Sequence, residues 1–199
     1  MFAKKPVAPP KPAPAQSSTQ SAPQSAPQPM GKTAGWAVQF LTTDYVASGY
    51  MTPIDMPLVG WLNVPTQAMV TLTQVLVMAL DPQIPVTSEM VSEITIPKAS
   101  IVAVVPRDEM SSRSATMQMP PNTEQAIIYA GPYWLRAAFR MAGGMPLRNL
   151  FGATTGDMLA VSDAEIKCLR PNAHFQAQKA TAIIINKSRV QLYHPSQRP

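Results

Sequence analysis

A constant spacing of 89 residues runs through this chain. Met56-Pro57-Leu58 recurs as Met145-Pro146-Leu147, and other apolar, proline and lysine positions coincide at the same spacing without a gap. The coincident pairs are Met69 and Met158, Leu80 and Leu169, Pro82 and Pro171, Ile94 and Ile183, Ile96 and Ile185, Lys98 and Lys187, and Pro106 and Pro195. An internal repeat sets the folding unit before any motif is considered. The spacing predicts two tandem units, residues 35–106 and 124–199, joined by a polar linker at 107–123.

Each unit is predicted to contain about five short β-strands, because runs of β-branched and aromatic residues alternate with turn residues. Sustained helical periodicity is missing, so the fold class is mainly β, with each unit a small β-barrel or a strongly twisted sheet. The expected strands are Val38–Thr42, Tyr45–Thr52, Met69–Leu80, Ile94–Ile96, Ile101–Val105, Ala126–Tyr129, Tyr133–Met141, Met158–Val161 with Glu165–Leu169, Ala182–Ile185 and Val190–Tyr193. The two units could share one sheet or pack face to face.

The last strand of each unit differs in its pattern. Val102–Val105 is an unbroken apolar run, which is typical of a strand buried on both faces. Its counterpart, Gln191–His194, alternates and should be half-exposed. We therefore expect Val102–Val105 near the interface between the two units.

Residues 1–34 form a tail rich in Pro, Ala, Gln and Ser. Such a composition cannot bury enough apolar surface to offset its ordering entropy, so the tail is predicted to be disordered. Pro-rich sequence follows Lys4 and Lys5 where a secretory signal would need an apolar segment. No run approaches the roughly 18 apolar residues of a membrane helix. With Cys168 as the only cysteine, these features favour a cytoplasmic protein.

The net charge of +5 is unevenly distributed. The tail carries four lysines and no acid. Residues 36–109 hold two basic and seven acidic residues, a net charge of −5, whereas residues 124–199 hold nine basic and four acidic residues, a net charge of +5. Two units of similar apolar pattern thus have opposite charge.

No catalytic, cofactor or metal signature is visible in the sequence. His174 and His194 have no second ligand at metal-binding spacing, and the chain lacks a P-loop, a dinucleotide fingerprint and a nucleophile elbow. Cys168 lies in a predicted strand, where a buried core thiol is the ordinary role. We therefore expect no cofactor, no metal and no enzymatic activity.

Basic and aromatic residues of the second unit are the candidate contacts to an anion or a nucleic acid. These candidates are Arg136, Arg140, Arg148, Lys187, Arg189 and Trp134. Lys98 and Lys187, the one charged pair kept at the 89-residue spacing, are better interpreted as turn lysines that cover a strand edge.

Several residues resemble short, uncharacterised bacterial β domains, here present as tandem copies. They are Gly49-Tyr50, Leu62-Asn63, Leu72-Thr73 and the closing segment Lys98–Pro106. That family implies no activity. The closing segment is also similar to the second motif of Sm-like RNA-binding barrels, although position 97 carries Pro where a contact residue is expected. No binding residue is transferred from either resemblance.

The sequence favours a non-catalytic interaction or scaffold protein that self-associates or organises a larger assembly. Its partner would be a second copy or another protein, because an acidic and a basic unit on one chain can attract each other between chains. The alternative function is binding of a nucleic acid or an anionic surface through the basic second unit and the tail.

Overall fold

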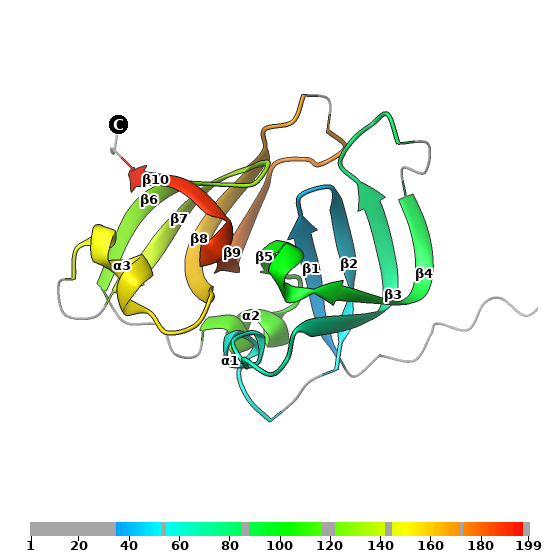
Figure 1. Cartoon of the computed structure of the whole chain (residues 1–199), viewed down its shortest axis with the longest axis horizontal. Coiled ribbons are helices and arrows are strands. Elements are labelled where there is room, and N and C mark those ends of the chain that lie inside the picture. Colours follow the sequence, from blue (N-terminus) through cyan, green and yellow to red (C-terminus); the bar gives the residue numbers. More distant parts are fainter. Residues whose placement is uncertain are drawn as a thin grey trace, which may run out of the picture. The chain divides into compact units, whose positions relative to one another are not determined.

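The computed structural model describes residues 35–52, 55–84, 88–116, 122–141, 145–171 and 173–196. The predicted disordered tail, residues 1–34, lies outside them. The described chain is mainly β, as predicted, with ten strands in one antiparallel sheet (Figure 1). The strands are β1 (Trp36–Thr42), β2 (Tyr45–Met51), β3 (Met69–Ala79), β4 (Ser88–Pro97), β5 (Ile101–Pro106), β6 (Asn122–Ala130), β7 (Tyr133–Met141), β8 (Met158–Cys168), β9 (Gln178–Asn186) and β10 (Val190–Pro195).

The strand order across the sheet is β10-β6-β7-β8-β9-β5-β1-β2-β3-β4. We call β1–β5 the N-terminal half and β6–β10 the C-terminal half. Within each half the last strand pairs with the first, and the other strands follow in chain order. The sheet is not closed, so β4 and β10 are its two open edges, and the halves share one continuous sheet instead of packing face to face.

Short helices connect the strands at matching places. α1 (Leu58–Leu62) lies between β2 and β3, and α3 (Leu147–Ala153) lies between β7 and β8. Single 3-10 turns, η1 (Lys98–Ser100) and η2 (Lys187–Arg189), lead into β5 and β10. α2 (Glu109–Thr116) lies in the segment predicted to be a plain polar linker.

α2 was missed because its sequence is polar and carries no apolar stripe. Its helical start is specified by local hydrogen bonds instead. The Asp108 carboxylate accepts from the backbone N–H of Ser111 at 2.6 Å and from that of Ala37 on β1 at 2.8 Å. This is an N-cap that also attaches the helix to the sheet. Ser111 and Ala115 are buried beneath it.

The two longest strands, β3 and β8, are irregular at their middle. Gln74 and Asp163, which are 89 residues apart, both have positive φ, at 51° and 50°. The pairing register shifts beside each of them, between Ser48 and Tyr50 on β2 and between Arg136 and Ala138 on β7. These are β-bulges, which bend a strand and increase its twist. β3 and β8 are therefore bent at matching positions.

The predicted strands agree with the structure to within two residues except at the starts of β4, β6 and β9, and β8 is continuous where two segments were predicted. β4 begins at Ser88, six residues before the predicted Ile94, and β6 and β9 begin at Asn122 and Gln178, each four residues before its predicted start. The added segments are mostly polar, so they lack the continuous apolar signal by which strands are recognised. The extra length of β4 gives the sheet a long open edge.

Candidate functional site

The most informative site is the joint between the two halves. β5 and β9 pair through Ala103 opposite Ile185 and Val104 opposite Ile184. Every residue of β5 is buried, as the apolar run Val102–Val105 predicts, and this strand lies where the two halves meet. Val102, Ala103 and Val105 pack into the core of the C-terminal half, while Ile101 and Val104 pack into that of the N-terminal half. We call this contact the internal joint.

Polar side chains lock the internal joint on several sides. The Asn186 amide donates to the Ile101 carbonyl at 2.9 Å, and the Gln178 amide donates to Gln39 Oε1 at 2.8 Å. Arg170 forms an ion pair with Asp44 at 2.7 Å, which raises the pKa of the arginine. Each bond joins one half to the other, so the joint has a fixed register.

Tyr133 is the largest fully buried side chain at the joint. Its phenol donates to the Thr42 carbonyl, at the turn between β1 and β2, at 3.1 Å. Burial raises the pKa of this phenol far above its ordinary value. The Tyr133 side chain therefore joins the two halves through both packing and one hydrogen bond.

Asn63, the residue after α1, makes a further contact between the two halves. Its amide donates to the Met158 carbonyl at 2.8 Å, and its Oδ1 accepts from the Met158 backbone N–H at 2.8 Å. Gly156 passes so close that a Cβ there would lie 2.4 Å from Asn63 Oδ1. Met158 itself is buried in the core of the N-terminal half.

Near the two open edges, apolar residues are exposed although their counterparts at the internal joint are buried. On β10, Leu192 is 56% exposed, whereas Ala103, at the corresponding place in β5, is fully buried. Leu169 after β8 is 54% exposed, and its counterpart Leu80 is fully buried. Both counterparts, Ala103 and Leu80, belong to the core that crosses the internal joint.

The N-terminal half shows the same contrast on its opposite side. Tyr45 begins β2 as Tyr133 begins β7, yet it is 45% exposed where Tyr133 is buried. Met69 begins β3 as Met158 begins β8, and it is 42% exposed where Met158 is 5% exposed. Tyr45, Met69, Leu169 and Leu192 were not singled out from the sequence as contact residues. A spacing of 88 or 89 residues relates each of them to its counterpart, but the contrast is visible only once the exposure of each counterpart is known.

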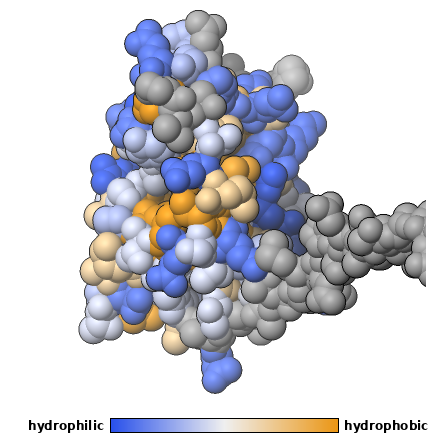
Figure 2. All heavy atoms as spheres, turned by 90° about the vertical axis from the view of Figure 1, so that its right-hand side faces the viewer, coloured by the Kyte–Doolittle hydropathy of each residue, from blue (hydrophilic) through white to orange (hydrophobic). Residues whose placement is uncertain are grey.

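A groove of about 400 Å³ lies beside the open edge β4. Its apolar lining comes from Tyr45, Ala47, Val77, Ile94 and Ile96. Figure 2, which views the molecule from the side of β3 and β4, shows an apolar patch bordered by hydrophilic surface. A sheet edge flanked by apolar surface is a template for pairing with another strand.

The six candidate basic and aromatic residues do not converge on one point. Trp134, Arg136 and Arg140 share the outward face of β7, and Lys167 lies 4.7 Å above the Trp134 ring. Arg136 is opposite Glu165, so its surroundings carry both signs of charge. Arg148 lies on α3, and the Arg189 guanidinium donates to the Ala99 carbonyl on η1. Their role as anion contacts stays a prediction.

Lys98 and Lys187 close the ends of helices. The Lys98 ammonium donates to the carbonyls of Leu62 and Val64, at 2.9 and 2.7 Å, after α1. Lys187 does the same at α3, donating to the carbonyls of Phe151 and Thr154 at 3.1 and 2.7 Å. Burial lowers the pKa of Lys98, while the charge of Asp157 acts to raise it. Both ammonium groups therefore bind carbonyls at helix ends, which is a structural role. The covering of a strand edge by this pair and an anion contact by Lys187 stay predictions.

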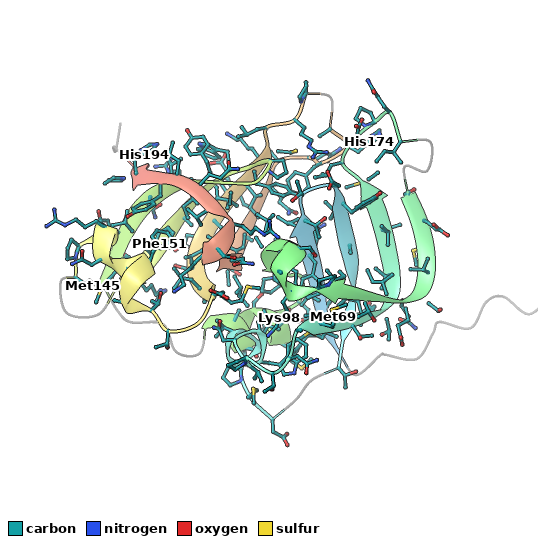
Figure 3. All side chains as sticks on the ribbon, in the orientation of Figure 1. Met69, Lys98, Met145, Phe151, His174 and His194 are labelled. Atoms are coloured by element: carbon teal, nitrogen blue, oxygen red, sulfur yellow. The ribbon has the colours of Figure 1, made fainter. Side chains whose placement is uncertain are left out.

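The residues considered for chemistry remain apart. His174 and His194 lie on opposite sides of the view in Figure 3. His194 is exposed at the end of β10, and Cys168 is half-buried at the end of β8. Among the described residues, no group of three or more His, Cys, Asp or Glu side chains could hold a metal ion.

No family model, curated protein or solved structure matches this chain. In the part of the chain that the structure describes, no helix has the length and apolar character needed to cross a membrane.

Proposed function

We propose that the protein is a non-catalytic interaction protein that self-associates head to tail through the open edges of its sheet. The observation that carries this proposal is that both open edges have counterparts inside the chain that are already paired with each other. β10 corresponds to β5, and β4 corresponds to β9. A second copy would therefore bring together the same two kinds of strand that meet at the internal joint.

In this proposal, the two halves are tandem copies of one unit. Three pairs of backbone hydrogen bonds in the loops support it. Lys98 N–H donates to Ala68 and Lys187 N–H to Asp157; Leu80 N–H donates to Asp44 and Leu169 N–H to Pro132; Arg107 N–H donates to Ala37 and Ser196 N–H to Gln125. In each pair the two donor residues are 89 positions apart, and the two acceptor residues are 88 or 89 positions apart. Copies of one unit would use one mode of pairing at every joint.

The charge distribution supports the same orientation. In a head-to-tail contact the acidic N-terminal half meets the basic C-terminal half of the next copy, whereas a contact between like halves meets repulsion. A head-to-tail contact is heterologous, so it produces rings if the rotation closes and filaments if it does not. A protein that assembles in this way can organise a larger structure without any chemistry of its own.

Sedimentation velocity of the full chain tests the proposal at low and high salt. We expect species larger than the 21.5 kDa chain at low salt, with partial dissociation at high salt because exposed charges are screened. The variant Leu192→Lys should shift the chain to a monomer. Leu76→Lys is the matched control, because Leu76 is also exposed and the corresponding position already carries a charge, Glu165. A monomer at both salt concentrations contradicts self-association.

The alternative function, binding of a nucleic acid, has one observation in its favour. Trp134, Arg136 and Arg140 lie on the outward face of a single strand, where stacking and charge could act together. An electrophoretic shift assay with single-stranded RNA at low salt tests it. Loss of the shift in a Trp134→Ala variant would support this interface, and absence of any shift would remove it.

A further inference from the structure

We infer that the groove beside β4 seats strand β10 of a second copy, with Leu192 opposite Ile96 and Tyr193 opposite Thr95. This inference rests on the proposed self-association and adds to it a defined register and an anchoring residue, Tyr45. The occupant is a second copy of this chain because the internal joint already shows what fills the equivalent place.

The register follows from the internal joint. There, Ala103 is opposite Ile185 and Val104 is opposite Ile184. Moving each β5 residue forward by 89 positions gives Leu192 and Tyr193 on β10. Moving each β9 residue back by 89 gives Ile96 and Thr95 on β4. Because side chains alternate between the faces of a strand, a slip of one residue would turn Leu192 away from the groove.

In the C-terminal half the place equivalent to the groove is already filled. Val102 of β5 lies against Gly131 at the turn between β6 and β7, where a Cβ would come within 3.3 Å of Val102 Cγ2. Around it, Tyr133, Ile183 and Ile185 belong to the same core. In the N-terminal half the matching residues Tyr45, Ile94 and Ile96 line the groove instead.

Tyr45 is the anchor of the intermolecular contact. Tyr133 buries its ring at the internal joint and donates to the Thr42 carbonyl. In the second copy, the residue that corresponds to Thr42 is Ala130, at the end of β6. We therefore place the Tyr45 phenol against the Ala130 carbonyl of the second copy, where it would gain both burial and one hydrogen bond.

The intermolecular joint lacks the polar locks of the internal joint. In the internal joint, Asn186 donates to Ile101, Arg170 pairs with Asp44, and Gln178 bonds to Gln39. The positions that correspond to Asn186, Arg170 and Gln178 carry Pro97, Asp81 and Glu89. The contact between chains therefore depends on apolar burial and on the short strand pairing. It should be reversible, whereas the internal joint is permanent.

Cysteine cross-linking tests the register in the full chain with Cys168 replaced by Ala. Two single variants, I96C and L192C, are mixed and oxidised, and the mixed disulfide is measured by mass spectrometry of the disulfide-linked peptides that a protease releases, because the intact dimers all have the same mass. Directly opposed strand residues have the Cα separation that a disulfide needs. We expect the mixed disulfide to form at least tenfold faster than with T95C in place of I96C, because residue 95 lies in the regular part of β4 and points to the other face.

The association constant of Tyr45 variants gives a second measurement that leaves the strands intact. Y45A should weaken self-association at least tenfold, and Y45F about fivefold, which is the size of one hydrogen bond. L76A is the control and should leave association unchanged. Equal cross-linking of L192C with I96C and T95C, or unchanged association of Y45A, overturns the register and the anchor even if the chain still sediments as an assembly. If the unsubstituted chain is monomeric, the proposed function fails as well.

Discussion

Asn63 offers the sharpest test of how the two halves are held together. Its side chain makes a donor and an acceptor bond to the backbone of Met158, both at 2.8 Å. The variant Asn63→Ala removes both bonds and leaves the Met158 N–H, in a residue that is only 5% exposed, without a protein acceptor. Each bond contributes about 1 kcal/mol, and an unsatisfied buried donor costs about 1–3 kcal/mol. We therefore expect the free energy of unfolding to fall by about 2–3 kcal/mol.

Gly156 provides a partner for a double-mutant cycle. Gly156 has φ of +80°, and an added Cβ would lie 2.4 Å from Asn63 Oδ1. Gly156→Ala therefore displaces the Asn63 side chain as well as straining the backbone. When Asn63 is already Ala, the first of these effects disappears. The loss in the double variant should thus be smaller than the sum of the two single losses by about 1 kcal/mol or more.

Urea denaturation at pH 7 and one fixed protein concentration measures these changes, because self-association would otherwise alter the apparent stability. Gly152→Ala is the matched control. Residue 152 occupies in α3 the position that Asn63 has after α1, and an added Cβ meets nothing within 4 Å. It should be neutral or stabilising by about 0.5–1 kcal/mol. A loss below about 0.5 kcal/mol for Asn63→Ala, or strict additivity in the cycle, would refute the role given to Asn63.

Three further predictions concern stability. Hydrogen bonds from the backbone outweigh burial and lower the pKa of Asp108. The contribution of Asp108 to the free energy of unfolding is therefore present above the ordinary carboxyl pKa and is lost as pH falls through the lowered value. The loss of stability in Asp108→Asn, measured by urea titration, should vanish in acid, and a loss that does not change with pH would contradict this. Lys98→Met and Lys187→Met should each lower the free energy of unfolding by about 1.5–3 kcal/mol, since each ammonium donates to two carbonyls, and unchanged thermal unfolding of either variant would disprove the assignment. Asp163→Gly should raise stability by roughly 1 kcal/mol, because glycine adopts positive φ without strain, and a loss would show that the Asp163 side chain stabilises the bulge.

The sequence predicted the strands well where they are buried and poorly where they are exposed. β3 and β8 were located from their apolar runs, and the full burial of β5 followed from Ile101–Val105. The start of β4 escaped because Ser88, Glu89 and Glu93 carry no apolar signal, and an edge strand needs none. α2 escaped because its start depends on a cap, Asp108, whose second bond reaches to a distant strand.

The candidate site shows the same division. The sequence singled out Arg136, Arg140, Arg148, Lys187, Arg189 and Trp134 because charge and aromaticity are visible in composition. Tyr45, Leu169 and Leu192 are ordinary apolar residues in a sequence. Their interest comes from being exposed where counterparts at the matching positions are buried, and exposure is a property of the folded chain.

By itself, the sequence determined the β character of the chain, the positions of most strands, the 89-residue spacing and the opposite charges of the two halves. These depend on local pattern and composition, which are written residue by residue. Only the tertiary structure decided that β5 pairs with β9 and that β4 and β10 are left as open edges. Strand pairing is made by backbone groups that all residues share, so the choice of partner is set by which apolar faces meet in three dimensions.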